Sequence, residues 1–100
     1  MADRAAKDAL FDAFAEAAKA LASGRRAEIV DVLAQGERSV EEVAGEIGQS
    51  VANTSHHLRT LLRAGLVSTR RQGSRVFYGL TSNQVGELWT ALRDVAVAHV

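Results

Sequence analysis

Cysteine and proline are both absent from the 100 residues of this chain. Without cysteine the chain forms no disulfide, offers no thiolate to a metal and has no thiol redox switch. Without proline, helix ends have to be located from glycines, capping residues and changes of hydrophobic period. No apolar stretch approaches the roughly twenty residues that a membrane span needs, and the first residues lack the pattern of a secretory signal. We therefore expect a cytoplasmic protein.

Acidic residues are missing from one long interval. No Asp or Glu occurs between Glu46 and Glu87, although the whole chain is formally neutral. The arginines in this interval are Arg59, Arg63, Arg70, Arg71 and Arg75. The formal charge is therefore −4 over residues 1–46, +5 over 47–86 and −1 over 87–100. Because guanidinium groups without neighbouring carboxylates attract polyanions and bind phosphate with two hydrogen bonds, this pattern indicates a nucleic-acid partner.

The hydrophobic pattern predicts a single domain over residues 1–100, made of five helices and one β-hairpin. An apolar fraction of 47% and a charged fraction of 24% are typical of a globular chain. Residues 66–71 and 75–80 have a period of two around Gln72-Gly73-Ser74, which predicts the hairpin. The helical period of 3.6 predicts helices over about 3–21, 24–34, 40–47, 51–64 and 83–98.

The centre of the chain carries two clear helix starts. Ser39-Val40-Glu41-Glu42 has the sequence of a capping box, in which the serine and the last glutamate each accept a hydrogen bond from the other's backbone amide. Gly48 ends this helix and Ser50 caps the next one. The side chains expected to face inward from the second helix are those of Val51, Thr54, Leu58, Leu61 and Leu62. A helix-turn-helix over about 39–64 and a hairpin over about 66–80 together predict a winged helix-turn-helix.

In this fold the second helix enters the major groove of DNA, and the hairpin, called the wing, lies along the backbone or the minor groove. Small polar side chains in the first half of that helix suit base edges, and arginines farther along suit phosphates. The candidate DNA-binding residues are Ser50, Ala52, Asn53, Ser55, His56, Arg59, Arg70, Arg71 and Arg75. No glycine-rich loop joins a strand to a helix, so Gly73 is interpreted as a turn residue rather than a phosphate cradle.

The first and last helices carry more apolar surface than a small winged domain can cover. We interpret these dimerisation helices, about 3–21 and 83–98, as a seam between two subunits. The expected interface residues are Leu10, Phe11, Phe14, Leu88, Trp89, Leu92 and Val95.

The stretch from Ser50 to Leu80, SVANTSHHLRTLLRAGLVSTRRQGSRVFYGL, resembles the ArsR/SmtB family of bacterial winged-helix repressors. The shared features are a Ser-His-His-Leu helix, an Ala-Gly-Leu-Val segment, and an Arg-Gly wing that ends in tyrosine and leucine. The resemblance implies a mainly α fold with a β-hairpin wing: four helices, two strands and a fifth helix. It also implies a homodimer that binds double-stranded DNA with an inverted repeat and leaves the operator when an inducer arrives.

The sequence also departs from this family. Arsenic and cadmium sensors of the family carry a Cys-Val-Cys element where this chain has Ser39-Val40-Glu41, and zinc and nickel sensors carry an Asp and His set where only Asp94 and His99 occur. The adjacent His56 and His57 lie about 100° apart on a helix and do not both face one ion. We therefore expect no metal and no cofactor, and the inducer is unknown.

Three interpretations stand beside the leading one, a dimeric transcriptional repressor. The chain could serve as a protein-interaction module without touching DNA. An enzyme is the weakest alternative, because there is no cysteine nucleophile, no Ser-His-acid set and no metal cluster, and no catalytic residue is expected. Finally, ALASGRRAEIVDVLAQGERSVEEVA resembles family members that carry an appended rhodanese-like domain, so the chain could be the DNA-binding part of a longer fusion.

Overall fold

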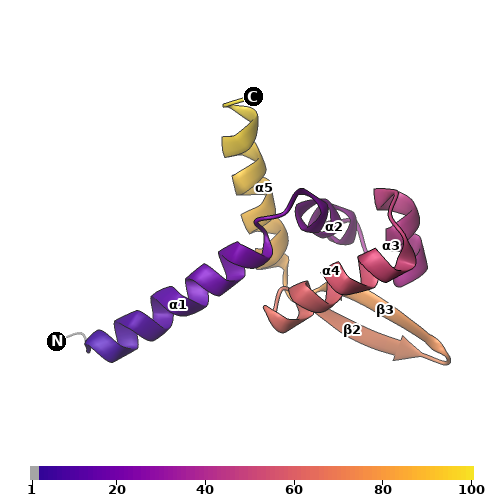
Figure 1. Cartoon of the computed structure of the whole chain (residues 1–100), viewed down its shortest axis with the longest axis horizontal. Helices are drawn as coiled ribbons and strands as arrows, with labels where there is room; N and C mark the ends of the chain where they lie inside the picture. Colours follow the sequence, from indigo (N-terminus) through magenta and orange to yellow (C-terminus); the bar gives the residue numbers. More distant parts are fainter. Residues whose placement is uncertain (1–2) are drawn as a thin grey trace.

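Five helices and a three-stranded antiparallel sheet make up residues 3–100, the part of the chain that the computed structural model describes (Figure 1). The elements are α1 (Arg4–Ala20), α2 (Gly24–Ala34), β1 (Arg38–Ser39), α3 (Val40–Ile47), α4 (Val51–Arg63), β2 (Val67–Gln72), β3 (Arg75–Leu80) and α5 (Asn83–Val97). Helices α3 and α4 form the predicted helix-turn-helix, and β2 and β3 form the predicted wing. The winged helix-turn-helix fold is confirmed.

The capping signals of the helix-turn-helix act as predicted. Ser39 Oγ accepts a hydrogen bond from Glu42 N at 3.2 Å, and Glu42 Oε1 accepts one from Ser39 N at 3.0 Å. Gly48 ends α3 in the left-handed conformation with φ of 65°, and the Ser50 side chain caps α4. At α5, by contrast, Ser82 occupies the N-cap position but its side chain makes no capping hydrogen bond.

The wing closes in a turn of two residues. β2 pairs with β3 as far as Gln72 opposite Arg75, so that Gly73 and Ser74 alone connect the strands. Gly73 has φ of 63°, a conformation that glycine adopts without steric cost, and positive φ at the first turn position is typical of a type II′ hairpin turn.

A third strand was not predicted. Arg38 and Ser39 form β1, which pairs with Tyr78 and Phe77 of β3, so the order in the sheet is β1-β3-β2. Two residues are too few to show a period of two, and the segment could be identified as a strand only by its partner. Because β1 leads directly into α3, it ties the start of the helix-turn-helix to the wing.

The core lies between α2, α3, α4 and the base of the sheet. Its largest fully buried side chains are Ile29, Val30, Ser39, Val43, Thr54, Leu58 and Leu61. Val51 and Leu62 were expected to join them, but they are 47% and 39% exposed. At 100° per residue the buried face is centred near Thr54, between Leu58 and Leu61, whereas Val51 and Leu62 lie about 20° and 40° beyond Leu58 on the side away from Leu61, and that flank stays in solvent. The prediction that Val51 and Leu62 face inward is therefore wrong.

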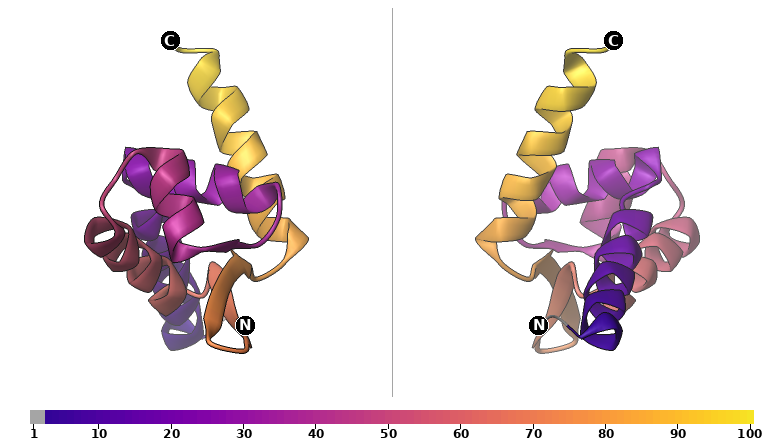
Figure 2. Two further views of the ribbon diagram at one scale, coloured as in Figure 1. Left: turned by 90° about the vertical axis from the view of Figure 1, so that its right-hand side faces the viewer. Right: turned by 90° about the vertical axis from the view of Figure 1, so that its left-hand side faces the viewer.

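Helices α1 and α5 project from this core in different directions (Figures 1 and 2). The radius of gyration of the Cα atoms is 14.9 Å, whereas a compact chain of this length has about 13 Å. Ala20, the last residue of α1, is the only buried residue of that helix. Among residues 3–100, no helix has both the length and the hydrophobicity to cross a membrane.

The Ser39 cap provides a test of the helix-turn-helix start. We expect Ser39→Ala to lower the free energy of unfolding by about 1 kcal/mol, because a buried cap acceptor for the amide of Glu42 is lost. Ser82→Ala is the matched control, since that serine makes no capping hydrogen bond, and it should change stability by less than about 0.5 kcal/mol. Urea unfolding followed by circular dichroism measures both. Equal effects of the two substitutions would contradict a special role of the α3 cap.

Candidate nucleic-acid interface

The outward face of α4 is polar and open to solvent. The exposed side chains among the predicted DNA-binding residues of this helix are those of Ala52, Asn53, His56 and Arg59. Ser55 is half-buried at the edge of this face. Ser50 Oγ accepts a hydrogen bond from Asn53 N at 3.1 Å, which leaves the hydroxyl proton of Ser50 available to an external acceptor such as a phosphate. The face can therefore offer both donors and acceptors to a ligand.

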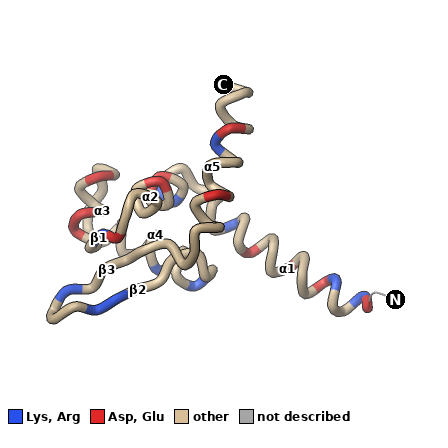
Figure 3. The backbone as a smooth tube through the Cα atoms, turned by 180° about the vertical axis from the view of Figure 1, so that it is seen from behind, with Lys and Arg blue, Asp and Glu red and all other residues tan. Residues whose placement is uncertain are grey.

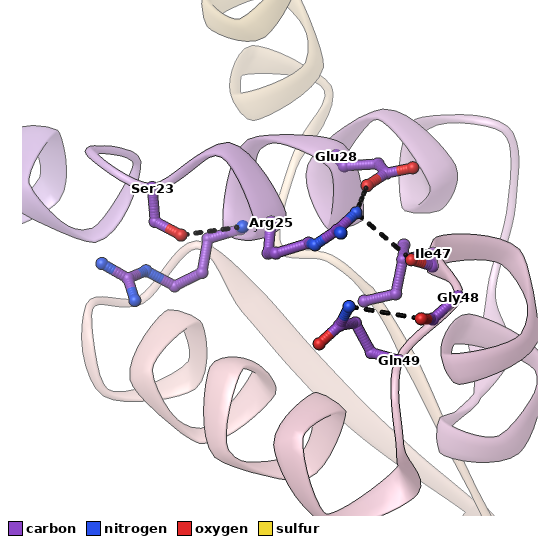
Figure 4. Close-up of polar contacts among 7 residues, drawn as sticks. Ser23, Arg25, Glu28, Ile47, Gly48 and Gln49 are labelled. Carbon is purple, nitrogen blue, oxygen red and sulfur yellow. Dashed lines mark hydrogen bonds and ion pairs between the residues drawn. The ribbon is translucent and has the colours of Figure 1, made fainter.

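Arg25 of α2 fixes the turn that leads into α4 (Figure 4). Its Nη1 donates to Glu28 Oε1 at 3.1 Å and to the carbonyl oxygen of Ile47 at 3.3 Å. In the turn itself, Gln49 Nε2 donates to the carbonyl oxygen of Gly48 at 3.2 Å. A cation at the carboxyl end of α3 also complements the dipole of that helix. The sequence analysis missed this role, because nothing local to Arg25 indicates that its side chain reaches the end of α3.

The three wing arginines divide between the two faces of the hairpin. Side chains alternate along a strand, so Arg70 and Arg71 point to opposite faces. Arg70 lies opposite Phe77 in the register, and the Cζ atoms of Arg70 and Arg75 are each 5.0 Å from the centroid of the Phe77 ring. Arg71 lies on the other face, which it shares with the buried Val67 at the base of β2. The wing therefore presents arginine on both of its faces.

Two of the wing arginines are paired with carboxylates. Arg70 Nε donates to both carboxylate oxygens of Glu37, at 3.1 and 3.2 Å, and Arg75 Nη2 lies 3.8 Å from Glu42 Oε1. The hydrogen bonds of Glu42 to Ser39 lower the pKa of its carboxyl group below the ordinary value of 4.5, and Arg75 adds to this effect. All four side chains are exposed, so solvent screens both pairs and they add little to stability.

These pairs change the electrostatic interpretation of the sequence. Residues 47–86 contain no acid, but β1 and the start of α3 bring Glu37 and Glu42 back beside the wing. Among residues 3–100, Arg59, Arg63 and Arg71 have no carboxylate within 4.0 Å. Figure 3 shows the basic residues of α4 and the wing toward one side of the molecule and the acidic residues of α2 and α3 toward the other. The positive charge of residues 47–86 that is not paired with a carboxylate is therefore smaller than their formal charge of +5.

His57 points into the protein rather than toward a ligand. Its Nδ1 atom is buried and has no hydrogen-bond partner among residues 3–100, as is also true of Thr54 Oγ1. Burial lowers the pKa of His57 below 6.5, and the nearby Arg26, His56 and Arg25 lower it further. The His56 and His57 rings are 5.9 Å apart and tilted by 55°. Within residues 3–100, no three His, Asp or Glu side chains come together as a metal site would require.

The residues predicted for the dimer interface form exposed apolar faces on α1 and α5. Leu10, Phe11 and Phe14 on α1 are 65%, 59% and 71% exposed. The exposed members on α5 are Leu88, Leu92 and Val95. Trp89 differs from the rest, because it is half-buried against the core and its Nε1 donates to Asp31 Oδ1 at 3.1 Å. Trp89 therefore anchors α5 to α2 within one chain.

A helix-turn-helix with an open polar second helix, followed by an arginine-bearing hairpin, defines a winged helix-turn-helix protein. The sequence model of the family described as "Bacterial regulatory protein, arsR family" matches residues 23–69. The chain belongs to this family, as the stretch from Ser50 to Leu80 predicted. The family is one of bacterial regulatory proteins, and the predicted membership is confirmed.

Individual relatives agree with this assignment. The chain is 43% identical over 94 residues to the HTH-type transcriptional regulator Rv0324 of Mycobacterium tuberculosis, a match that covers 94% of this chain and 42% of that protein. The solution NMR structure of the homodimeric winged helix-turn-helix DNA-binding domain of Mb0332 from Mycobacterium bovis is similar with a TM-score of 0.90 and 42% identity, covering 100% of this chain and 91% of that one. The crystal structure of the transcriptional repressor BigR from Xylella fastidiosa is similar with a TM-score of 0.78 and 31% identity, covering 94% and 96%.

The chain spans about half the length of the curated relatives that it matches, with shares of 42%, 56% and 62% for three of them. The appended rhodanese-like domain stays a prediction.

The environment of His57 predicts how stability depends on pH. Because the pKa is lowered in the folded state, the unfolded chain binds more protons, and stability falls as the pH drops through 6.5 toward the folded-state pKa. Glu42, whose pKa is lowered from 4.5, also contributes to the free energy of unfolding, but this contribution is lost only at more acidic pH. We therefore expect the free energy of unfolding to be lower at pH 5.5 than at pH 7.5, and His57→Gln to reduce that difference. Denaturant unfolding at the two pH values measures it.

The control for this experiment is His99→Gln, which changes an exposed histidine at the end of the chain. A pH dependence that is the same in His57→Gln as in the unchanged protein would contradict the lowered pKa of His57.

Proposed function

We propose that this domain is a homodimeric, sequence-specific DNA-binding repressor that acts in the cytoplasm on an operator with an inverted repeat. The observation that carries the proposal is the outward face of α4. Burial of Thr54, Leu58 and Leu61 fixes the rotation of this helix, and Asn53, His56 and Arg59 are left in solvent on a rigid support. A helix held in this way, with polar residues in its first half, has the geometry of a recognition helix.

The proposed contacts follow from chemistry and position. Asn53 can form two hydrogen bonds with adenine, and His56 and Ser55 suit base edges or phosphates close by. Ala52 is small enough to let the helix approach the groove, and the Ser50 hydroxyl can donate to a phosphate. Arg59, one turn farther along α4, reaches the backbone. In the wing, Arg70, Arg71 and Arg75 contribute phosphate contacts, of which Arg71 has no competing carboxylate nearby.

The dimer is supported by the exposed apolar faces of α1 and α5. Helix α1 has 17 residues and buries only Ala20, whereas most of the stability of a helix in a protein comes from packing of its apolar face. Its exposed Phe11 and Phe14 and the apolar face of α5 supply a hydrophobic surface for a second copy. The Mb0332 domain, which is similar over the whole chain, is described as homodimeric. In such a dimer the two recognition helices would lie about 34–36 Å apart, one turn of DNA.

Arg71→Gln tests the DNA contact. We expect weaker binding to every duplex, whatever its sequence, and a slope of log affinity against log salt that is smaller by about one, because one phosphate contact is lost. Fluorescence anisotropy with labelled duplexes across salt concentrations measures both quantities. Arg93→Gln on α5 is the control with the same change of charge. Unchanged affinity in Arg71→Gln, or binding that does not depend on salt in the original protein, would favour an interaction module without DNA contact.

Phe14→Ser tests the dimer. Loss of an aromatic side chain from the proposed seam should weaken self-association and, with it, binding to a duplex that carries two half-sites. Analytical ultracentrifugation over a range of protein concentrations gives the dimer dissociation constant. Leu62→Ser, which changes an exposed leucine of α4 outside the seam, is the control and should leave the dimer intact. A dimer of unchanged strength in Phe14→Ser would place the interface elsewhere.

A further inference from the structure

Glu37 lies on the wing although it belongs to the segment between α2 and β1. Both of its carboxylate oxygens accept a hydrogen bond from Arg70 Nε, and 33 residues separate the two partners in the sequence. The contact depends on β1, whose pairing with Tyr78 and Phe77 places Glu37 beside the end of β3.

Gly79 makes room for the Glu37 side chain. A Cβ atom at this position of β3 would lie 3.1 Å from Glu37 Cγ, closer than an ordinary van der Waals contact. The stem of Glu37 therefore crosses the strand where a side chain is missing, and its carboxylate reaches Arg70 on the neighbouring strand.

The guanidinium group of Arg70 is held on three sides. Glu37 occupies the Nε edge, Gln72 Oε1 accepts a hydrogen bond from Nη1 at 3.0 Å, and the Phe77 ring lies 5.0 Å from Cζ. Of the five N–H groups of an arginine, only two are used in these bonds, so the remaining three can still meet a phosphate. Any phosphate that does so comes close to the carboxylate of Glu37, and the two negative charges repel each other.

We propose that Glu37 competes with the DNA backbone for Arg70 and thereby limits the affinity of the wing for any duplex. This inference rests on the proposed function. The carboxylate offsets the charge of Arg70 and repels a phosphate that approaches its free N–H groups, so the wing makes a weaker contribution to sequence-independent binding than its three arginines imply. Affinity then depends more on the base contacts of α4, which raises the ratio of specific to non-specific binding.

Arg75 also lies near a carboxylate, that of Glu42, but the contact is weaker. Its contact with Glu42 is 3.8 Å, longer than a hydrogen bond, and Glu42 also accepts the amide of Ser39 in the capping box. A substitution of Glu42 would disturb the start of α3 together with the ion pair. Glu37, which caps no helix and is exposed, is therefore the residue to test.

The experiment compares the unchanged protein with Glu37→Gln, Arg70→Gln and the double variant, by anisotropy with a labelled duplex of scrambled sequence at several salt concentrations. We expect Glu37→Gln to bind about threefold to tenfold more tightly at low salt, because one negative charge next to the phosphate is removed. Its slope of log affinity against log salt should be steeper, since Arg70 then forms a full phosphate contact. In the Arg70→Gln background, Glu37→Gln should have little effect.

Glu87→Gln on α5 is the charge-matched control, and it should leave affinity and salt slope unchanged. Equal or weaker duplex binding by Glu37→Gln would overturn the inference and show that Glu37 only orients Arg70 or stabilises the fold. Tighter binding that persists in the Arg70→Gln background would overturn it too, because the carboxylate would then act without Arg70. Failure of the unchanged protein to bind any duplex would remove the proposed function and this inference together, whereas normal binding without the Glu37 effect removes the inference alone.

Discussion

Burial of one face of α4 is the constraint on which the rest of this structure depends. Thr54, Leu58 and Leu61 are fully buried against α2 and α3. Because this core is closely packed, it holds α4 at one rotation about its own axis. Once these three side chains are inside, the residues one half-turn away must face solvent. The same packing that stabilises the domain thus selects the side chains that are available to a ligand, and Arg25 fixes the turn from which the helix starts.

The electrostatics of the wing follow from a very short element. Strand β1 contributes only two residues to the sheet, yet it carries Glu37 to Arg70 and the start of α3 to Arg75. Carboxylates therefore offset the charge of two wing arginines, Arg70 and Arg75. Arg71, on the opposite face of the hairpin, is not paired in this way. In the proposed repressor this pairing would limit non-specific binding, because non-specific sites in a genome far outnumber operators and compete through phosphate contacts.

The two outer helices have a different relation to the core. Trp89 anchors α5 through a hydrogen bond to Asp31, and Ala20 anchors the end of α1, but the remaining length of α1 exposes leucine and phenylalanine and that of α5 exposes leucine and valine. Within residues 3–100 these side chains stay exposed to solvent. A second copy of the chain that packs against these side chains would stabilise the projecting parts of α1 and α5. It would also set the distance between the two recognition helices.

The sequence by itself determined the features that depend on near neighbours. Capping residues fixed the starts of α3 and α4, Gly48 and Gly73 fixed two turns, and the helical period identified the polar face of α4. Contacts between distant residues were decided only by tertiary structure: the strand β1, the pairs of Glu37 with Arg70 and of Trp89 with Asp31, which are 33 and 58 residues apart, and the exposure of Val51 and Leu62. The physical reason is that caps, turns and periodicity act within one or two helical turns, whereas an ion pair across a sheet, or the width of a buried helical face, depends on which elements pack together.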